Sequence, residues 1–246
     1  MDRLIHTALS GMRASMDSQR VIASNMANAN TLGFRAEMLD QRAVTIEGQP
    51  NEAPAMQRAS VRGADMAAGE TIATGRDLDV AVETDALIAV QAVDGTEAYT
   101  RRGDLSVSAT GLLVNGEGRP VLGDNGPITV PPVGIPGIAP DGSITIADPA
   151  APDQPPAEIG RIKLAAWEGS PISKGLDGLF RVEGGGILPT DEAATVKVGS
   201  LEQSNVKTTE VLVDMIDAQR LFAMRSKVIS TAREIDESGA QLMRLG

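Results

Sequence analysis

The stretch ASNMANANTLGFRA, residues 23–36, carries three asparagines, Asn25, Asn28 and Asn30, and then the break LGF at 32–34. The residues before it have the period of an amphipathic helix. Asparagine is a mediocre helix former, because its side-chain amide competes for nearby backbone groups. Taken alone, the asparagines are typical of a surface helix that frays and is capped at its end. Their place in the last turns of a long apolar pattern asks for a further reason.

The residues ahead of this stretch predict a long N-terminal helix. Apolar positions recur in alternating steps of four and three, which is the spacing of a coiled-coil seam with one polar interruption. A helix over residues 3–29 would be roughly 40 Å long, from the rise per residue of an α-helix. The predicted seam consists of Ile5, Leu9, Met12, Met16, Gln19, Ala23 and Met26.

The C-terminal residues predict a second long helix of the same kind. Ser204 and Asn205 are candidate N-caps, and Glu210 lies in an early turn. The seam again has a polar residue in its middle and consists of Leu212, Met215, Gln219, Phe222, Ser226 and Ile229. Both apolar stripes are too long for one small domain to cover. We therefore expect the two helices to pack together, and then against other copies.

Between the helices, the pattern changes to short apolar runs separated by turn residues. Residues 37–75 have little period and many turn formers, so we expect an extended connector there. Residues 76–190 alternate strand-like runs with Gly and Asn turns, as antiparallel meanders do, and 191–204 form a return segment. The predicted fold class is α+β. Residues 1–36 and 205–246 form a coiled-coil-like helical pair, and the centre is an antiparallel β-rich domain.

Charge and composition exclude several classes of function. The net charge is −11 and the pI is about 4.6, which argues against nucleic acid or an anionic membrane as a partner. The chain has no cysteine and only 2% aromatic residues, so thiolate chemistry is excluded and a sugar- or base-stacking site is not expected. The first residues alternate apolar and polar, so we expect neither a cleaved signal peptide nor membrane insertion.

Catalytic and metal sites find little support in the sequence. His6 is the single histidine, which excludes a multi-histidine metal site and leaves a catalytic triad without a base. Asp77 and Asp79 would point to one face of a strand and could form a carboxylate pair for hydrolysis. A solvated strand face explains them more simply. We predict no catalytic residue, no cofactor and no metal.

The two ends of the chain together resemble the bacterial flagellar rod and hook proteins. In that family the first helix closes on an A-N-N-x-A-N-x-x-T-x-G-F/Y pattern, which the opening stretch matches except that Ser24 replaces the first asparagine. The C-terminal GSLEQSNVKTTEVLVDMIDAQRLFAMRSKVI is similar to the tail signature, and YTRRGDLSVSATGLLVNGEGRPVLG to the family's β-domain. One departure is TDALIAV at 84–90, where the family usually has G-x-G-F-F.

The resemblance implies a structural, non-enzymatic subunit of the basal-body rod. The length and the MDR opening resemble the F type of proximal-rod member more than a distal-rod or hook protein. The resemblance also implies passage through the flagellar type III export apparatus, helical assembly with other rod and hook-type axial proteins, and a place in the rod that crosses the periplasm. In such nested helices, the asparagines would bond neighbouring backbones and fix register. Gly33 would then release the chain, and Phe34 would anchor its exit.

The predicted assembly interface gathers the seam positions and the signature residues of both ends. It consists of Ile5, Leu9, Met12, Met16, Asn25, Asn28, Gly33, Phe34, Asn205, Met215, Gln219, Phe222 and Ile229. Alternatives from the same family are a distal-rod or hook-type axial protein. Two from other classes are an exported enzyme acting on peptidoglycan, which needs a carboxylate pair in a groove, and a soluble coiled-coil adaptor. An adaptor has no obvious use for the long acidic middle.

Overall fold

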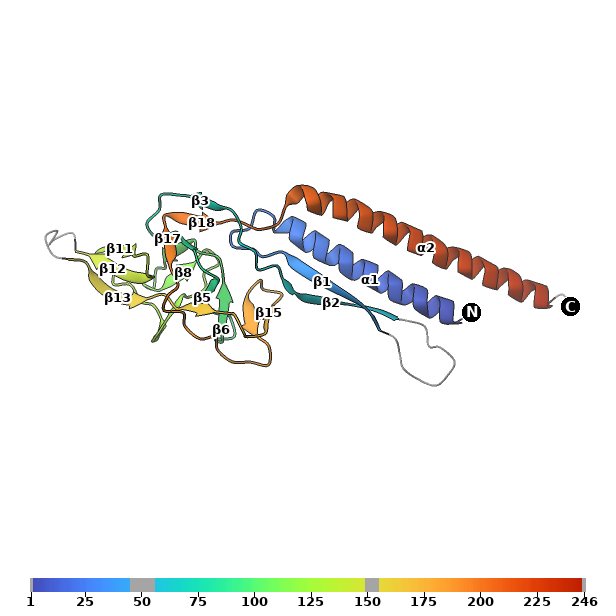
Figure 1. The fold of residues 1–246 in the computed structure, drawn as a ribbon, viewed down its shortest axis with the longest axis horizontal. Helices are drawn as coiled ribbons and strands as arrows, with labels where there is room; N and C mark the ends of the chain where they lie inside the picture. Colours follow the sequence, from blue (N-terminus) through green and yellow to red (C-terminus); the bar gives the residue numbers. More distant parts are fainter. Residues whose placement is uncertain (1, 45–55, 149–154, 245–246) are drawn as a thin grey trace. The chain divides into compact units, whose positions relative to one another are not determined.

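A computed structural model describes residues 2–44, 56–148 and 155–244 of the chain (Figure 1). Its contacts divide the chain into two compact units. Unit 1 lies within residues 1–29, 37–63 and 206–246, and unit 2 within residues 30–36 and 64–205. The last part of the N-terminal signature, 30–36, thus belongs to the β-rich unit and not to the helical one.

Unit 1 consists of two helices and a β-ribbon. The helices are α1 (Asp2–Ala27) and α2 (Thr208–Arg244), and the strands are β1 (Glu37–Val44) and β2 (Met56–Ala64). The helices run antiparallel and side by side, with their free ends together, and the β1–β2 pair lies along α1 (Figure 1). Segment 37–75, expected to be an extended connector, carries β1, β2 and β3 (Thr71–Ala73).

The contact between α1 and α2 includes several polar bonds. The Arg225 guanidinium donates to the Gly11 carbonyl and to the Ser15 hydroxyl. The Gln19 side-chain amide donates to the Ala218 carbonyl over 3.4 Å. Small residues on α1 allow this close approach.

The predicted fold class is wrong. Among the described residues there is one helix near each end and a mostly β centre, and the helices do not form the predicted coiled-coil-like pair. On α1 two members of the predicted seam are exposed, Leu9 at 40% and Met16 at 56%. The residues buried instead are Ser10, Ala14, Ser15, Val21 and Asn25. A count of apolar spacing misses this face, since its members are mostly small or polar.

Unit 2 is built from short strands in antiparallel ladders. The largest sheet has the order β14-β5-β6-β16-β15, a second has the order β11-β12-β13, and two-stranded ladders join β17 to β4, β18 to β3, β7 to β8 and β10 to β9. The remaining bounds are β4 (Val80–Val82), β5 (Ala86–Gln91), β6 (Glu97–Thr100), β7 (Leu105–Val107), β8 (Leu113–Asn115), β9 (Leu122–Gly123), β10 (Gly126–Pro127), β11 (Ile135–Ile138), β12 (Ser143–Ala147), β13 (Ala157–Arg161), β14 (Leu164–Ala166), β15 (Ile172–Lys174), β16 (Phe180–Val182), β17 (Val196–Val198) and β18 (Ser200–Glu202).

Two apolar clusters form the core of unit 2, and β5 lies between them. Ile88 and Val90 belong to the larger cluster, whereas Leu87 and Ala89 belong to the smaller one. Successive side chains of a strand point to opposite faces, so β5 is buried on both sides. The apolar run of TDALIAV, which departs from the family pattern, is what such a doubly covered strand requires.

A buried ion cluster ties distant segments of unit 2 together. Glu202, 3% exposed, contacts Arg35 Nη2 at 2.7 Å through Oε1 and Arg101 Nε at 2.9 Å through Oε2. Arg35 is only 1% exposed. Arg101 also donates through Nη1 to the carbonyls of Thr84 and Ala86. Burial lowers the pKa of Arg101 from its ordinary value, and the nearby Glu202 carboxylate opposes this shift.

Removing a core side chain should destabilise unit 2 selectively. Leu113 is fully buried in the larger cluster, so Leu113→Ala should lower the free energy of unfolding by about 2–5 kcal/mol. The exposed Val93 supplies a matched control, because Val93→Ala should change it by less than about 0.5 kcal/mol. The single tryptophan, Trp167, packs against the smaller cluster of unit 2, so its fluorescence in a urea titration reports the transition. Equal effects of the two substitutions would contradict the assigned core.

Neutralising Glu202 should cost about as much as truncating a buried apolar side chain. Glu202→Gln leaves two buried guanidinium groups without a counter-charge, and breaking a buried pair costs about 3–5 kcal/mol. The control is Glu192→Gln, because Glu192 is exposed. Trp167 fluorescence in urea measures both variants. If Glu202→Gln lowers the free energy of unfolding by less than about 1 kcal/mol, the ion cluster does not hold these distant segments together.

Candidate assembly interface

Asn25 bonds the backbone of its own chain through both ends of its side-chain amide. Its Oδ1 accepts from the Glu37 N–H at 2.8 Å, and its Nδ2 donates to the Glu37 carbonyl at 3.0 Å. Next to it, the Ser24 hydroxyl donates to the Glu37 carboxylate at 3.0 Å. The two-sided use of the amide was expected, but the partner lies in β1 of the same chain. Within unit 1, Asn25 thus joins the end of α1 to the start of β1.

In unit 2, Asn205 likewise bonds backbone groups through both ends of its side-chain amide. Its Oδ1 accepts from the Ala36 N–H at 2.7 Å, and its Nδ2 donates to the carbonyls of Asp65 and Ala67 at 2.9 and 3.0 Å. Its own N–H donates to the Phe34 carbonyl at 3.2 Å. The side chain therefore links three segments far apart in the sequence, and it does so just before α2 begins. It was predicted as a helix cap, whereas these bonds go to residues outside any helix or strand.

Gly33 and Phe34 fix the path of the chain after α1. Gly33 has φ +64°, and a Cβ there would lie 2.4 Å from the backbone carbon of Arg101, so only glycine fits. Its N–H donates to the Glu202 carbonyl at 2.8 Å. The Phe34 ring is buried beneath the Lys174 ammonium, 3.3 Å from the ring centroid. The contact is of the cation–π type and lies where the chain leaves α1.

The remaining predicted interface residues lie on the helices of unit 1. Asn28 donates to the Ser24 carbonyl at 2.9 Å, within the last turns of α1. Met12 is half-buried, and the side chain of Ile5 lies outside the described residues. On α2, Met215, Phe222 and Ile229 are half-buried, whereas Gln219 is exposed. Their part in assembly stays a prediction.

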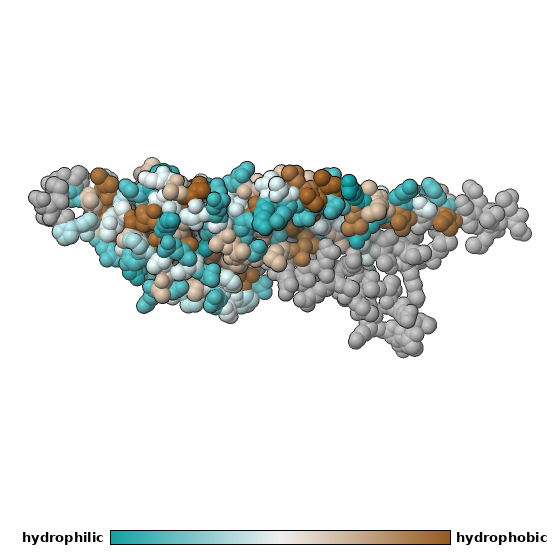
Figure 2. Space-filling view, turned by 45° about the horizontal axis from the view of Figure 1, so that its top comes forward, coloured by the Kyte–Doolittle hydropathy of each residue, from teal (hydrophilic) through white to brown (hydrophobic). Residues whose placement is uncertain are grey.

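The helix α2 carries an exposed apolar stripe beside the predicted seam. Its members lie at steps of three, eight, four and seven residues, which places them on one face, opposite the half-buried positions. They are Val213, Ile216, Met224, Val228 and Ile235. Figure 2 shows hydrophobic atoms at intervals along the helical part of this face. The signal is present in the sequence as a second apolar period beside the heptad steps, which by themselves do not reveal Val213, Ile216 or Met224.

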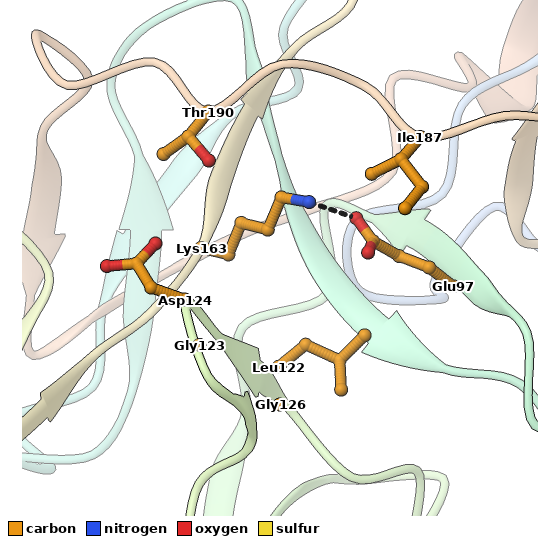
Figure 3. Close-up of a pocket in the computed structure, with 8 residues that line it drawn as sticks. All are labelled: Glu97, Leu122, Gly123, Asp124, Gly126, Lys163, Ile187 and Thr190. Carbon is orange, nitrogen blue, oxygen red and sulfur yellow. Dashed lines mark hydrogen bonds and ion pairs between the residues drawn. The ribbon is translucent and has the colours of Figure 1, made fainter.

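The hollow in Figure 3 is built around a structural ion pair and does not have the character of a reaction centre. It has a volume of about 240 Å³ and is lined by Glu97, Leu122, Gly123, Asp124, Gly126, Lys163, Ile187 and Thr190. The Lys163 ammonium contacts the Glu97 carboxylate at 2.6 Å. The Tyr99 hydroxyl donates to the same carboxylate at 2.8 Å. Burial raises the pKa of Tyr99, so this hydroxyl keeps its proton and serves as a donor.

The carboxylates weighed for hydrolysis do not form a pair. Asp77 is exposed, whereas Asp79 is buried and accepts from the Thr74 hydroxyl at 2.7 Å. Over the residues searched, which are those the structure describes, acidic, histidine and cysteine side chains form no group able to hold a metal ion. In the same residues no helix is both long and apolar enough to cross a bilayer.

Three family models match successive parts of the chain. The model described as "Flagella basal body rod protein" matches residues 5–35. The "Flagellar hook protein FlgE/F/G D1 domain" matches residues 81–148. The "Flagellar basal body rod FlgEFG protein C-terminal" matches residues 197–242. The first and third cover the two signatures on which the resemblance was based, and the second covers much of unit 2.

Whole-length relatives give the same assignment. The chain is 41% identical to the flagellar basal-body rod protein FlgF of Salmonella typhimurium and 40% identical to that of Escherichia coli, in each case over all of both chains. It is 32% identical to the flagellar basal-body rod protein FlgG of Bacillus subtilis, over 99% of this chain and 100% of the relative. The resemblance inferred from the end motifs is thereby confirmed. The chain belongs to the family of flagellar basal-body rod proteins.

Proposed function

We propose that the chain is a non-enzymatic structural subunit of the proximal part of the flagellar rod, and that its two helices carry the contacts with neighbouring axial proteins. Membership in the rod family supports the structural role. The identity to FlgF proteins over the full length, together with the MDR opening, favours the proximal type.

The exposed apolar stripe on α2 is the observation that carries this proposal. Val213, Ile216 and Val228 lie opposite the face that turns toward α1. On α1, Leu9 and Met16 are likewise exposed, opposite its buried face. Each such side chain gains about 1.5–3 kcal/mol when it is fully covered. Two helices that each keep an apolar stripe in water are therefore suited to neighbours on their outer sides.

The partners that fit these stripes are the helices of other rod and hook-type axial proteins. Helices with apolar stripes pack on each other through those stripes. The proposal places the subunit in the rod of the basal body, which it reaches through the flagellar type III export apparatus. In the hollow of Figure 3, Lys163 is held in an ion pair with Glu97. Of the two aspartates considered for hydrolysis, Asp77 is exposed and Asp79 is buried. Both observations favour a structural role over a peptidoglycan-acting enzyme.

Charges placed in the stripe should abolish assembly and leave the subunit folded. In Ile216→Asp/Val228→Asp, two carboxylates occupy the outer face of α2, so that burying this face against a neighbour becomes costly. Both side chains are exposed in the chain itself, so the free energy of unfolding should change by less than about 1 kcal/mol. The readouts are swimming of cells that lack the wild-type protein, the amount of subunit exported, and urea unfolding of the purified chain.

Ser226→Asp is the matched control, because Ser226 is exposed on α2 but lies off the stripe. We expect Ser226→Asp to restore swimming to nearly wild-type level. The double variant should be exported normally and fail to restore it. Full swimming with the double variant would refute the assignment of this face to assembly.

A further inference from the structure

Two consecutive peptide groups, at residues 36 and 37, are each held by an asparagine side chain. The Ala36 N–H donates to Asn205 Oδ1 at 2.7 Å, and the Glu37 N–H donates to Asn25 Oδ1 at 2.8 Å. The carbonyls follow the same division. The Ala36 carbonyl accepts from the Asp65 N–H at 2.8 Å, and the Glu37 carbonyl accepts from Asn25 Nδ2 at 3.0 Å.

This division follows from the geometry of an extended chain. In a strand, the N–H and C=O of one residue point to one side and those of the next residue to the other. Two residues facing each other in an antiparallel ladder exchange both of these bonds. The carboxamide of Asn25 offers one acceptor and one donor, and it satisfies Glu37 as a facing strand residue would. A helix side chain thus takes the place of a ladder partner.

We propose that Asn25 is a positioning residue that sets the register of β1 on α1. A shift of β1 by one residue would bring Ala36 or Met38 opposite Asn25, and the N–H and C=O of either residue point away from it. Such a shift would also turn every side chain of β1 to the opposite face. Compared with a shift of one residue in either direction, only the observed register satisfies the buried amide of Asn25.

The side chain at position 25 has to be asparagine for this role. Aspartate keeps an acceptor for the Glu37 N–H, but it has no donor for the Glu37 carbonyl. Alanine has neither. Asn28 lies one turn further along the helix and donates to the Ser24 carbonyl of α1, so it serves as the matched control. The inference concerns the folded chain before assembly and does not rest on the proposed function.

Amide exchange of the full chain, resolved by residue, provides the first test. Asn25→Ala should speed exchange of the Glu37 amide roughly 5- to 150-fold, the range that corresponds to loss of one buried hydrogen bond. Asn25→Asp keeps that bond, so it should speed exchange less than about threefold. Asn28→Ala should leave the Glu37 amide unchanged within about twofold. An unchanged amide in Asn25→Ala, or equal acceleration in the Ala and Asp variants, would overturn the proposal.

A cross-linking test reads the register itself, and the absence of native cysteine makes it clean. The side chains of Ser24 and Glu37 meet at 3.0 Å, so Ser24→Cys paired with Glu37→Cys should react with a short bifunctional thiol reagent. Pairs of Ser24→Cys with Ala36→Cys or Met38→Cys should react poorly. Adding Asn25→Ala should lower the first yield severalfold and raise the other two, whereas Asn28→Ala should change none of them.

The cross-linking pattern decides the matter even where Asn25→Ala lowers stability, because register is read as a ratio of yields within each background. An unchanged ratio in Asn25→Ala would show that β1 keeps its register on α1 without the asparagine, and the proposal would fail. In Asn25→Asp, which lacks the donor to the Glu37 carbonyl, we expect a ratio between those of the wild type and the alanine variant. A ratio equal to that of the wild type would show that the donor has no part in setting register.

Discussion

A buried carboxylate between two buried guanidinium groups constrains the β-rich unit more than any other contact. Removing ions from water is costly, and the cost is offset only where geometry and further hydrogen bonds are good. Glu202 contacts Arg35 at 2.7 Å and Arg101 at 2.9 Å, and its Oε1 also accepts from the Gly69 N–H at 2.9 Å. Because these groups come from four separate segments, the segments must meet in one place. Gly33 and Phe34 directly precede Arg35 in the sequence, so their positions are fixed together with it.

The helical unit is held together by a different kind of contact, and this difference fits a structural subunit. Its inner contacts use a guanidinium, hydroxyls and backbone carbonyls, which are directional and hold the helices in one arrangement. Its apolar side chains are in part left on the outside. Directional polar contacts inside the chain and adaptable apolar contacts outside it suit a protein of the rod family, whose neighbours in an assembly need not all be alike.

The sequence predicted the positions that matter better than it predicted their partners. The asparagines were singled out correctly as unusual, and the use of both ends of the amide was expected. Asn25 nevertheless bonds Glu37, a residue without any motif of its own. Such a pairing depends on how the chain turns after Gly33, and residue spacing does not contain that information.

The helix faces were misjudged for a physical reason. A heptad count weighs apolar volume, whereas the face of α1 that is buried carries small and polar residues such as Ser10, Ala14 and Ser15. These allow close approach of backbones and add little to an apolar pattern. The positive charge of Arg225, one residue before the predicted seam position Ser226, gave no hint of its role between the helices. By contrast, β5 was recognised as a strand because its apolar run is short and bounded by turns.

The interleaving of the two units has a consequence for how the chain folds. The polypeptide passes from the helical unit to the β-rich unit and back twice, so that the helical unit is made of three separate pieces. Its contacts join residues as far as 214 positions apart. Contacts of such long range carry a large loop-closure cost and form slowly. During synthesis the first helix therefore waits, without its partner helix, until nearly the whole chain has been made.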